Sequence, residues 1–382
     1  MKNKEKKVKN IALVDMPLLI TVFILLGFGM IMVLSASAPS ALATYGDSYH
    51  NLKTQLEAAG IGLIAMLFFI NFDYTRLKKH YKVIYVLSVL ILFTVLIPKV
   101  GVENNGATRW IKIGSMQLQP SEITKIGLII SLAGYYTDEK KEHNSFMNGV
   151  LKPLFAIAVP ILILLLVQDH LSAGIIIGAV SLIIIIMSGN MTFGYFLRTT
   201  GLAAIFASLY VLYKKKGDSS KSFRADRIEA WLHPLENSSG TAYQTTQGLY
   251  AIGSGKLFGV GIGNSKQKYS YIPEAHNDFI FAIIAEELGF VGCLFVIALF
   301  ITFTIRGLVI AMKSKDMFGS LVAVGITSLV ALQAILNIAV VTNSIPNTGI
   351  SLPFLSYGGS SLIILLASVG ILLSISKSAK KI

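Results

Sequence analysis

An aspartate at the edge of an apolar stretch is the residue of this sequence best placed to do chemistry. Residues 271–289 pass from a polar loop into a long apolar run, and Asp278 lies at the transition. An ionisable group at membrane depth is costly and is therefore a functional candidate by default. Apolar surroundings also raise the pKa of a carboxyl group toward the working pH. Asp278 is thus the candidate general base, with capping of the following helix as a serious alternative role.

The helix expected to follow Asp278 carries two further groups of interest. Small residues recur at helical spacing as far as Gly289, which lets another helix or a lipid chain pack closely. Glu286 falls about 80° from Asp278 around such a helix and could line the same cavity. His276 is a candidate partner for Asp278, although a single histidine at a membrane interface is usually an ordinary polar anchor.

A second group of charges lies where another apolar run begins, at residues 119–125. Glu122 and Lys125 are spaced so that they share one face of a helix and can pair. Such a pair either neutralises itself and joins two helices, or forms the polar wall of a substrate cavity. Just upstream, Arg109 has a planar guanidinium that suits bidentate contact with a phosphate. Trp110 beside it is as well explained as an interfacial anchor.

A third segment, residues 346–361, is rich in proline and glycine and cannot form a continuous helix. We expect residues 342–359 to fold back at membrane depth, where only protein or a watery cavity can satisfy the backbone. A new helix should begin near Gly359 and direct free N–H groups toward an anion. The candidate ligand-binding residues here are Ser356, Gly358, Gly359 and Ser360. A purely structural kink is an equally open interpretation.

Composition indicates the elements that must position these groups. Of the 382 residues, 54% are hydrophobic and only 14% are charged, so the apolar segments are membrane spans rather than a globular core. We predict an all-α polytopic membrane protein, a single integral membrane domain over residues 1–382, with about ten transmembrane helices. The apolar runs centre on residues 11–35, 56–72, 84–97, 123–136, 154–167, 171–187, 193–212, 278–305, 321–341 and 360–376.

The net charge of +13 is explained by topology. If the spans alternate, most lysines and arginines of the short connections lie on one side, whereas the short connections of the other side hold only Lys53, Lys99, Arg109 and Lys112. The positive-inside rule then places both termini in the cytoplasm. We therefore expect contact with membrane lipids and no nucleic-acid partner.

The long outer loop between the seventh and eighth spans, residues 214–275, is itself basic. Arg224 and Arg227 are its likeliest ligand-binding members, although a merely solvated loop would look the same. Its glycines near residues 254–263 permit close approach of the backbone to a ligand, which alone is weak support. The single cysteine, Cys293, excludes a disulfide within the chain and a cysteine-based metal site.

At this point the motifs are recognisable. Residues 106–125, 273–289 and 346–361 resemble, in order, the motifs of the SEDS family of FtsW, RodA and SpoVE, and in detail the FtsW and SpoVE branch. The resemblance implies a ten-helix peptidoglycan glycosyltransferase that polymerises lipid II into nascent glycan on the outer face of the bacterial cytoplasmic membrane. It also implies a class B penicillin-binding transpeptidase as partner, in division, elongation or sporulation.

The family's functional residues can be carried over one by one. Its essential acidic residue corresponds to Asp278, its cavity pair to Glu122 and Lys125, its outer-loop arginine to Arg109, and its loop glutamine to Gln247. One motif departs from the family: many members have Glu-Pro-Asp-x-Gly where residues 168–172 read Gln-Asp-His-Leu-Ser. Either Asp169 or His170 therefore stands in the position of the family's aspartate.

These residues suggest a mechanism and two alternatives. Asp278 would deprotonate the acceptor hydroxyl, while Arg109, Lys125, Arg224 and Arg227 would stabilise the departing diphosphate. A divalent cation, Mg or Mn, could share that task, although no independent metal motif is present. A lipid II flippase would also use polar residues along its spans. A scaffold for wall-synthesis enzymes would need none of the charged residues.

Overall fold

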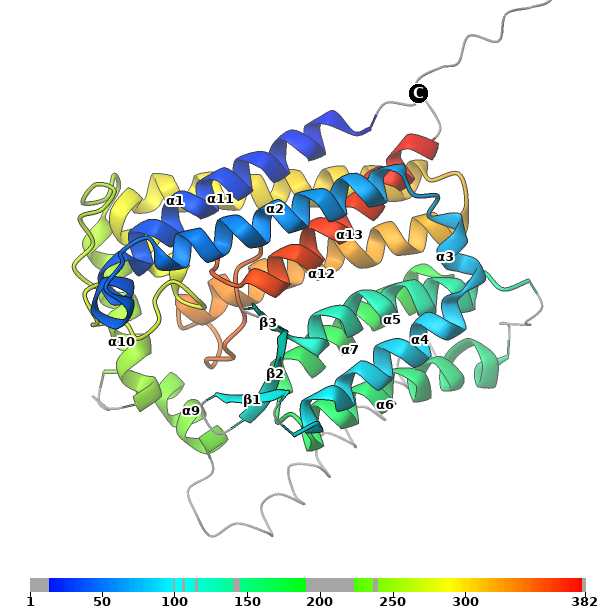
Figure 1. The fold of residues 1–382 in the computed structure, drawn as a ribbon, viewed down its shortest axis with the longest axis horizontal. Helices are drawn as coiled ribbons and strands as arrows, with labels where there is room; N and C mark the ends of the chain where they lie inside the picture. Colours follow the sequence, from blue (N-terminus) through cyan, green and yellow to red (C-terminus); the bar gives the residue numbers. More distant parts are fainter. Residues whose placement is uncertain are drawn as a thin grey trace, which may run out of the picture.

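The computed structural model describes residues 14–98, 100–104, 107–113, 116–139, 145–189, 223–235 and 240–379. Most of them are helical (Figure 1). The helices are α1 (Met16–Tyr45), α2 (His50–Asn71), α3 (Thr75–Lys79), α4 (Tyr81–Leu90) with the 3₁₀ segment η1 (Ile91–Leu96), α5 (Pro120–Tyr136), the π-helical turn η2 (Met147–Leu151) leading into α6 (Lys152–Leu166), α7 (Leu171–Met187), α9 (Phe223–Leu232), α10 (Gly240–Gly255), α11 (Ile280–Lys313), α12 (Met317–Val341) and α13 (Gly359–Ser378).

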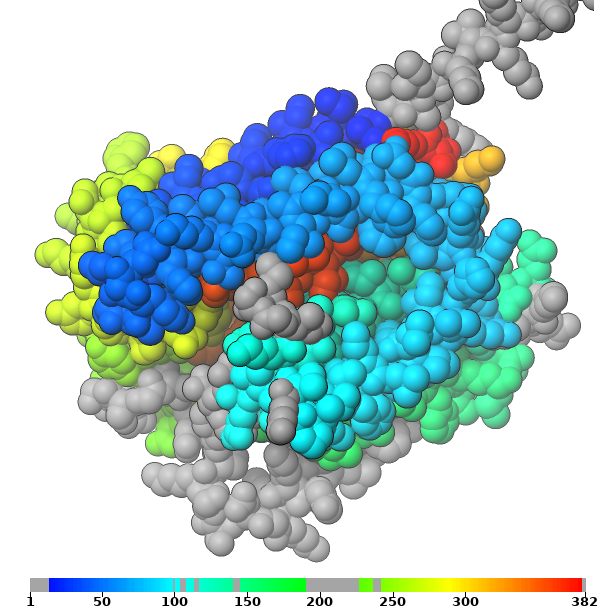
Figure 2. Space-filling view, viewed as in Figure 1, coloured from blue at the N-terminus to red at the C-terminus, as the bar shows by residue number. Residues whose placement is uncertain are grey.

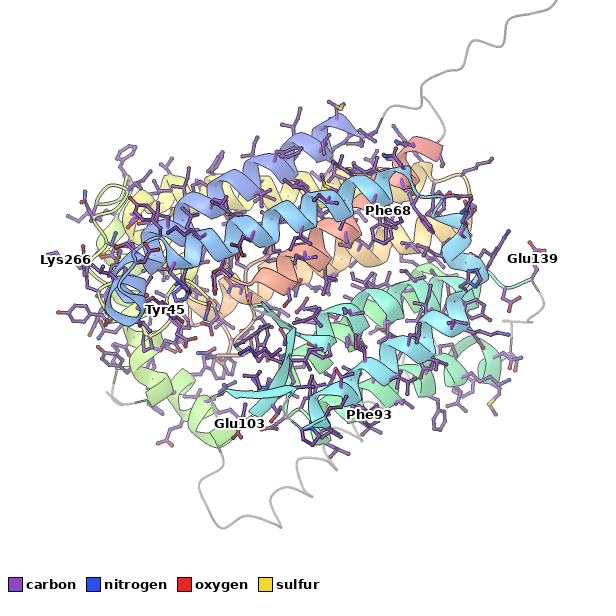
Figure 3. The ribbon with its side chains drawn as sticks, in the orientation of Figure 1. Tyr45, Phe68, Phe93, Glu103, Glu139 and Lys266 are labelled. Carbon is purple, nitrogen blue, oxygen red and sulfur yellow. The ribbon has the colours of Figure 1, made fainter. Side chains whose placement is uncertain are left out.

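The helices confirm a polytopic membrane protein. Within the described residues, six helical segments are long and apolar enough to cross a bilayer, namely α1, α2, η2 with α6, α11, α12 and α13. Shorter apolar helices cover Tyr81–Leu96 and Leu171–Met187. Each predicted span in the described part of the chain corresponds to a helix, whereas the span predicted at 193–212 lies outside it. Phe68 on α2 points outward from the helices, and the charged residues Lys266 and Glu139 lie at opposite ends of the molecule (Figure 3).

The helices form two groups that meet at α12. One group contains α1, α2, α11, α12 and α13, and the other contains α4 to α7 (Figure 1). α12 contacts both, since it packs on α11 and α13 and also on α5 and α7. Gly325 makes this approach feasible: a Cβ there would lie 2.5 Å from a methyl group of Ile129 on α5 and 3.0 Å from one of Ile184 on α7. The bundle therefore has one continuous core.

The predicted outer segments gather at one end of the bundle, called the site end below. The residues around Arg109, which the family resemblance places in an outer loop, instead contain a three-stranded antiparallel sheet of β1 (Gly101–Asn104), β2 (Ala107–Ile113) and β3 (Met116–Leu118). The region predicted as one long loop contains α9 and α10, which lie beyond the ends of the spans (Figure 1). The all-α expectation thus holds for the spans but misses this small sheet.

α11 is interrupted near the site end, and the glycine-rich loop at residues 254–263 supplies hydrogen-bond partners for the backbone at the interruption. Gly289 has φ 66° and ψ −164°, so it cannot continue the helix. Amides of residues 260 and 261 donate to the carbonyls of residues 286 and 287, and amides of residues 290 and 291 donate to those of residues 256 and 257, at 2.9–3.1 Å. Buried irregular backbone needs such partners. The glycines therefore serve close packing on α11 rather than contact with a ligand.

Candidate active site

A cavity of about 150 Å³ opens at the site end between the two helix groups. The face seen in Figure 2 is hollowed between α2 and the strands, and atoms of α13 form its floor. β2, the first turns of α5, the turn before α7, and residues 349–358 all contribute to its wall. Of the predicted site residues, those that line it are Arg109, Glu122, Lys125, Ser356 and Gly358.

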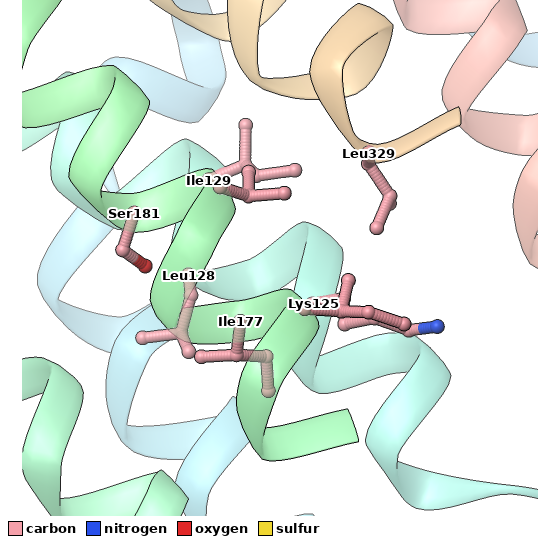
Figure 4. A pocket seen from close by; sticks show the side chains of 8 residues that line it. Lys125, Leu128, Ile129, Ile177, Ser181 and Leu329 are labelled. Atoms are coloured by element: carbon pink, nitrogen blue, oxygen red, sulfur yellow. The ribbon is translucent and has the colours of Figure 1, made fainter. Parts of the chain in front are cut away.

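Glu122 and Lys125 form an ion pair in the cavity wall. Pro120 begins α5, and the two charged residues follow in its first turns. Lys125 Nζ lies 2.7 Å from Glu122 Oε1, and the lysine side chain is only 3% exposed against 16% for the glutamate. The lysine stem borders a second, much smaller space of about 10 Å³ lined mainly by aliphatic side chains (Figure 4). The pair is therefore both a neutralised ion pair and part of the cavity wall, but it lies within α5 and does not join two helices.

Arg109 on β2 is partly engaged by protein. Its Nε donates to the carbonyl of Gln168 at 3.2 Å, and its Nη2 donates to that of Asp169 at 2.7 Å. These bonds attach the sheet to the turn between α6 and α7. The simple expectation of a guanidinium free for phosphate therefore needs correction. Because a guanidinium has five N–H groups, donors remain for a ligand in the cavity.

Asp169 and His170, in the turn before α7, have different surroundings. Asp169 is exposed and has a positive φ of 45°, whereas His170 lines the cavity. His170 Nε2 lies 2.7 Å from Gln119 Nε2. Burial, with the nearby charges of Arg109 and Lys125, lowers the pKa of His170 to about 3. His170 is therefore a neutral hydrogen-bonding group in the cavity wall.

Asp278 lies at the rim of the cavity rather than in its lining. α11 begins at Ile280 with Phe279 at its N-cap and without a side-chain cap bond, so Asp278 does not cap the helix. It sits instead in the preceding turn and is partly exposed. A Cβ built on Gly349, which does line the cavity, would lie 3.6 Å from Asp278 Oδ2. The carboxylate thus faces the segment that forms the cavity wall.

The surroundings of Asp278 disfavour its charge. Burial, helped by the nearby Glu274, raises its pKa to about 6, although a backbone hydrogen bond and the nearby Arg227 act in the opposite direction. Burial lowers the pKa of the neighbouring His276, which favours the neutral imidazole. A carboxyl group that titrates near neutrality is suited to accept a proton from a substrate hydroxyl.

The segment between α12 and α13 folds back at the site end, and α13 begins at Gly359 as predicted. Gln55 on α2 holds its end: Nε2 donates to the Ser356 carbonyl at 3.2 Å, and Oε1 accepts from Gly358 N at 3.1 Å. Ser356 Oγ accepts from Leu352 N, and Ser360 Oγ accepts from Gln119 N. The predicted anion site is therefore corrected in part. Both serine hydroxyls already have protein partners, and Gly359 and Ser360 do not line the cavity.

The long connection contributes differently from the expectation. Arg227 on α9 donates to the Asn347 carbonyl at 3.1 Å. Gln247 lies on α10 and does not line the cavity, whereas Gln244 accepts from Asn347 Nδ2 at 3.4 Å. The side chain of Arg224 lies outside the described residues. Of these polar residues, Arg227 and Gln244 contact the segment that lies beside Asp278.

Glu286 was expected to line the cavity, and this was wrong. Its carboxylate accepts from Ser265 Oγ and from Lys266 N, away from Asp278. The expectation assumed that Asp278 belongs to the same helix, whereas it precedes α11. The adjacent Glu287 accepts from Ser35 on α1 at 2.6 Å and pairs with Lys268 Nζ at 3.0 Å. Through these interactions both glutamates attach the loop after α10 to α11, and Glu287 also connects it to α1.

Two buried amides escaped the sequence interpretation, Gln55 on α2 and Asn337 on α12. Asn337 Nδ2 donates at 2.7 Å to the carbonyl of Asp278 and at 2.7 Å to that of Ile350. A signal was present, because strongly polar residues inside apolar spans are rare and often functional. Within the described residues, no group of three or more His, Cys, Asp or Glu side chains could hold a metal ion.

Comparison with known proteins agrees with this arrangement over nearly the whole chain. The family model FtsW/RodA/SpoVE, described as cell cycle protein, matches residues 16–381. Stage V sporulation protein E of Bacillus subtilis is 41% identical over 96% of this chain and 98% of its own length. The probable peptidoglycan glycosyltransferase FtsW of Trichlorobacter lovleyi is 38% identical over 98% of this chain and 96% of its own length.

Two solved structures share the fold. A peptidoglycan synthase complex, described as coordinating polymerization and crosslinking, contains a chain that superposes with a TM-score of 0.76 at 25% identity. The match covers 95% of this chain and 97% of that one. The rod shape determining protein RodA of Thermus thermophilus superposes with a TM-score of 0.68 at 25% identity, over 96% of this chain and 98% of that one.

Proposed function

This chain belongs to the FtsW/RodA/SpoVE family, and on that premise we propose that it is a peptidoglycan glycosyltransferase that joins lipid II units into β-1,4-linked glycan. One observation supports this activity above the others. The carboxylate of Asp278, with its pKa raised to about 6, faces Gly349 on the wall of a cavity that also contains Arg109 and Lys125. A base and two cations therefore meet around one space large enough for part of a lipid-linked sugar.

The chemistry needs a base on one side of the reacting carbon and cations on the other. Asp278 takes the proton of the acceptor GlcNAc 4-hydroxyl, whose oxygen bonds to the anomeric carbon of the terminal MurNAc of the growing glycan. The bond from that carbon to diphosphate breaks, the configuration inverts, and polyprenyl diphosphate leaves. Arg109, Lys125 and Arg227 are assigned to the negative charge of the leaving group. Ser356 and Gly358 contribute cavity wall.

The other predicted ligand residues have different positions in the proposal. Gly359, Ser360 and Gln247 do not line the cavity. In the proposal, Gly359 and Ser360 support the cavity wall from the start of α13, and Gln247 acts from α10 in the long connection. Arg224 retains its predicted role toward the diphosphate. A divalent cation, Mg or Mn, would arrive with the diphosphate, because the described acidic residues supply no cluster for a resident ion.

We assign the site end to the outer face of the bacterial cytoplasmic membrane, with both termini in the cytoplasm. The basic residues of the opposite connections support this orientation through the positive-inside rule. A class B penicillin-binding transpeptidase is the proposed partner, supported by the likeness to a chain of a complex that couples polymerization to crosslinking. Division, elongation and sporulation all remain compatible with the site.

Polymerisation of purified lipid II in detergent tests the activity. The native protein, alone or with its transpeptidase, should make long glycan, and Asp278→Asn should make none. Glu274→Gln is the matched control, because it removes an exposed carboxylate from the same turn and should retain activity near pH 7.5. Normal polymerisation by a correctly inserted Asp278→Asn protein would remove the base assignment.

The same preparations distinguish the alternative functions. A flippase would move lipid II across liposomes while making no glycan even with the transpeptidase present. A scaffold would tolerate neutral replacements of both Asp278 and Glu122. The clustering of the charged cavity residues at one end of the helices favours catalysis, because a flippase needs a polar path through the bilayer.

A further inference from the structure

A buried amide on α12 bonds to two backbone carbonyls beside the site. Asn337 is fully buried, and its Nδ2 lies 2.7 Å from the Asp278 carbonyl oxygen and 2.7 Å from the Ile350 carbonyl oxygen. Only the NH₂ group of an amide can donate, so two acceptors on the same side fix the orientation of this side chain. Asn337 therefore joins two irregular segments that are distant in the sequence.

These two segments are the ones that must be held in register for the reaction. Asp278 presents its carboxylate toward Gly349, and Ile350 is the next residue in the cavity wall. Neither carbonyl belongs to a helix, since α11 begins at Ile280 and α13 at Gly359. Buried carbonyls outside regular structure require a donor. A single side chain on a rigid helix supplies that donor to both.

The segment is fixed at its other end as well. Gln55 on α2 bonds to the Ser356 carbonyl and to the Gly358 amide. The two bonds from Gln55 set the position of residues 356–358, directly before the start of α13 at Gly359. The Tyr357 amide also donates to the His276 carbonyl at 2.9 Å, but the carbonyl of Asp278 itself is tied to the segment through Asn337.

We propose that Asn337 is a positioning residue for catalysis, which holds the turn of Asp278 in register with residues 349–350. This inference rests on the proposed glycosyltransferase activity with Asp278 as its base. Asn337 acts through backbone carbonyls and does not contact the reacting atoms. Loss of its two bonds should let the turn move and admit water around the Asp278 carboxylate.

The test compares Asn337→Leu with Thr327→Val. Leucine has the same branched arrangement of side-chain heavy atoms as asparagine, although it is larger, and it has no hydrogen-bond donor. Thr327 is fully buried on the same helix and its Oγ1 has no hydrogen-bond partner, so Thr327→Val is a matched control. Polymerisation rates are measured from about pH 5 to pH 8, which brackets the acid limb expected for a carboxylate base. The charged groups acting on Asp278, namely Glu274 in its own turn and Arg227 on α9, are unchanged in both variants.

Asn337→Leu should slow polymerisation by about 10- to 100-fold, because small misplacements of a catalytic group are costly. The midpoint of the acid limb should also move by at least about half a pH unit toward lower pH, since hydration favours the charged carboxylate. Thr327→Val should leave the rate and the midpoint unchanged. The midpoint is informative because it does not depend on the fraction of active protein.

Two outcomes would overturn the inference. One is a native rate and midpoint in Asn337→Leu, and the other is a lower rate with an unmoved midpoint, which indicates a structural role only. If Asn337→Leu does not insert into the membrane, Asn337→Gln replaces it, because the longer side chain keeps the N–H donors but displaces them. A native polymerisation rate and a native acid-limb midpoint in Asn337→Gln would also overturn the inference. Failure of the proposed function is recognised separately, by the absence of glycan from the native protein even with its transpeptidase, and failure of the base assignment by normal polymerisation in Asp278→Asn.

Discussion

Asp278 and Gly349 face each other across the rim of the cavity, and Gly349 has a left-handed φ of 66°. The glycine belongs to the segment between α12 and α13, and the aspartate belongs to the turn before α11. Any movement of the backbone at Gly349 therefore changes the surroundings of the Asp278 carboxylate. A side chain at this position strains that backbone even though the space beside Asp278 would accept it.

Gly349→Ala should lower the rate of lipid II polymerisation by at least about tenfold, because the strained backbone displaces the wall facing Asp278. The free energy of unfolding should fall by only about 1–2 kcal/mol, the usual cost of a left-handed alanine. Gly46→Ala is the control. Gly46 has φ 72° with nothing near its missing Cβ, so it carries a similar strain at a position that does not line the cavity. Equal activity of the two variants would contradict the importance of Gly349.

Breaking the pair between Glu122 and Lys125 separates its structural role from its catalytic role. Glu122→Gln leaves a buried lysine without its partner and should cost about 3–5 kcal/mol of stability. The double variant Glu122→Gln with Lys125→Met should recover most of that stability because no lone charge remains. It should still polymerise poorly, since a cation of the cavity is lost. Thermal unfolding and polymerisation assays on the three proteins decide this, and full activity of the double variant would leave only the structural role.

The sequence was a good guide to the spans and to the kinds of groups at the site. Apolar runs locate helices because the bilayer requires them, and the charges of Arg109, Glu122 and Lys125 did meet in one cavity. Residue-level geometry was less accessible. Asp278 was placed on a helix that begins only at Ile280, and this error carried Glu286 wrongly into the cavity.

The missed features depend on tertiary contacts. The sheet at residues 101–118 is made of short strands with little periodic pattern. Such strands can be seen in the folded structure but give no signal in a hydropathy profile. The glycine-rich loop pairs with α11 where the helix is interrupted at Gly289. Nothing in the sequence around Gly289 indicates that this loop is its hydrogen-bonding partner. Only the buried amides had a signal, as polar residues in apolar runs.

Glu287 should be essential for stability although it lies away from the cavity. It is fully buried, bonds to Ser35 and pairs with Lys268, so Glu287→Gln leaves the lysine uncompensated and should cost about 3–5 kcal/mol. Asp47→Asn, which breaks the exposed pair with Lys53, is the matched control and should have no measurable effect. Thermal unfolding in detergent measures both. Equal unfolding temperatures for the two variants would show that the Glu287 cluster does not brace the loop.

The activity should depend on the ionisation of Asp278. Because the base must be unprotonated, polymerisation should fall as the pH is lowered through about 6, the raised pKa of this group. Glu274 helps to raise that pKa, so Glu274→Gln should move the acid limb toward lower pH without abolishing activity. Rates measured across this range at constant lipid II concentration check both statements. An acid limb that Glu274→Gln moves toward higher pH would contradict the assignment.

The raised pKa of Asp278 also predicts that this residue lowers the free energy of unfolding near neutral pH. A folded pKa of about 6 lies above the ordinary value of about 3.9, so between these values the folded state binds more protons than the unfolded state. Stability therefore falls as the pH rises through this window and stays lower at neutral pH. Asp278→Asn should raise the free energy of unfolding by about 1–3 kcal/mol near pH 7, with no gain below about pH 4. Thermal unfolding of the native and variant proteins at both pH values tests this. An unfolding temperature of Asp278→Asn at or below the native one near pH 7 would contradict a base held at a cost in stability.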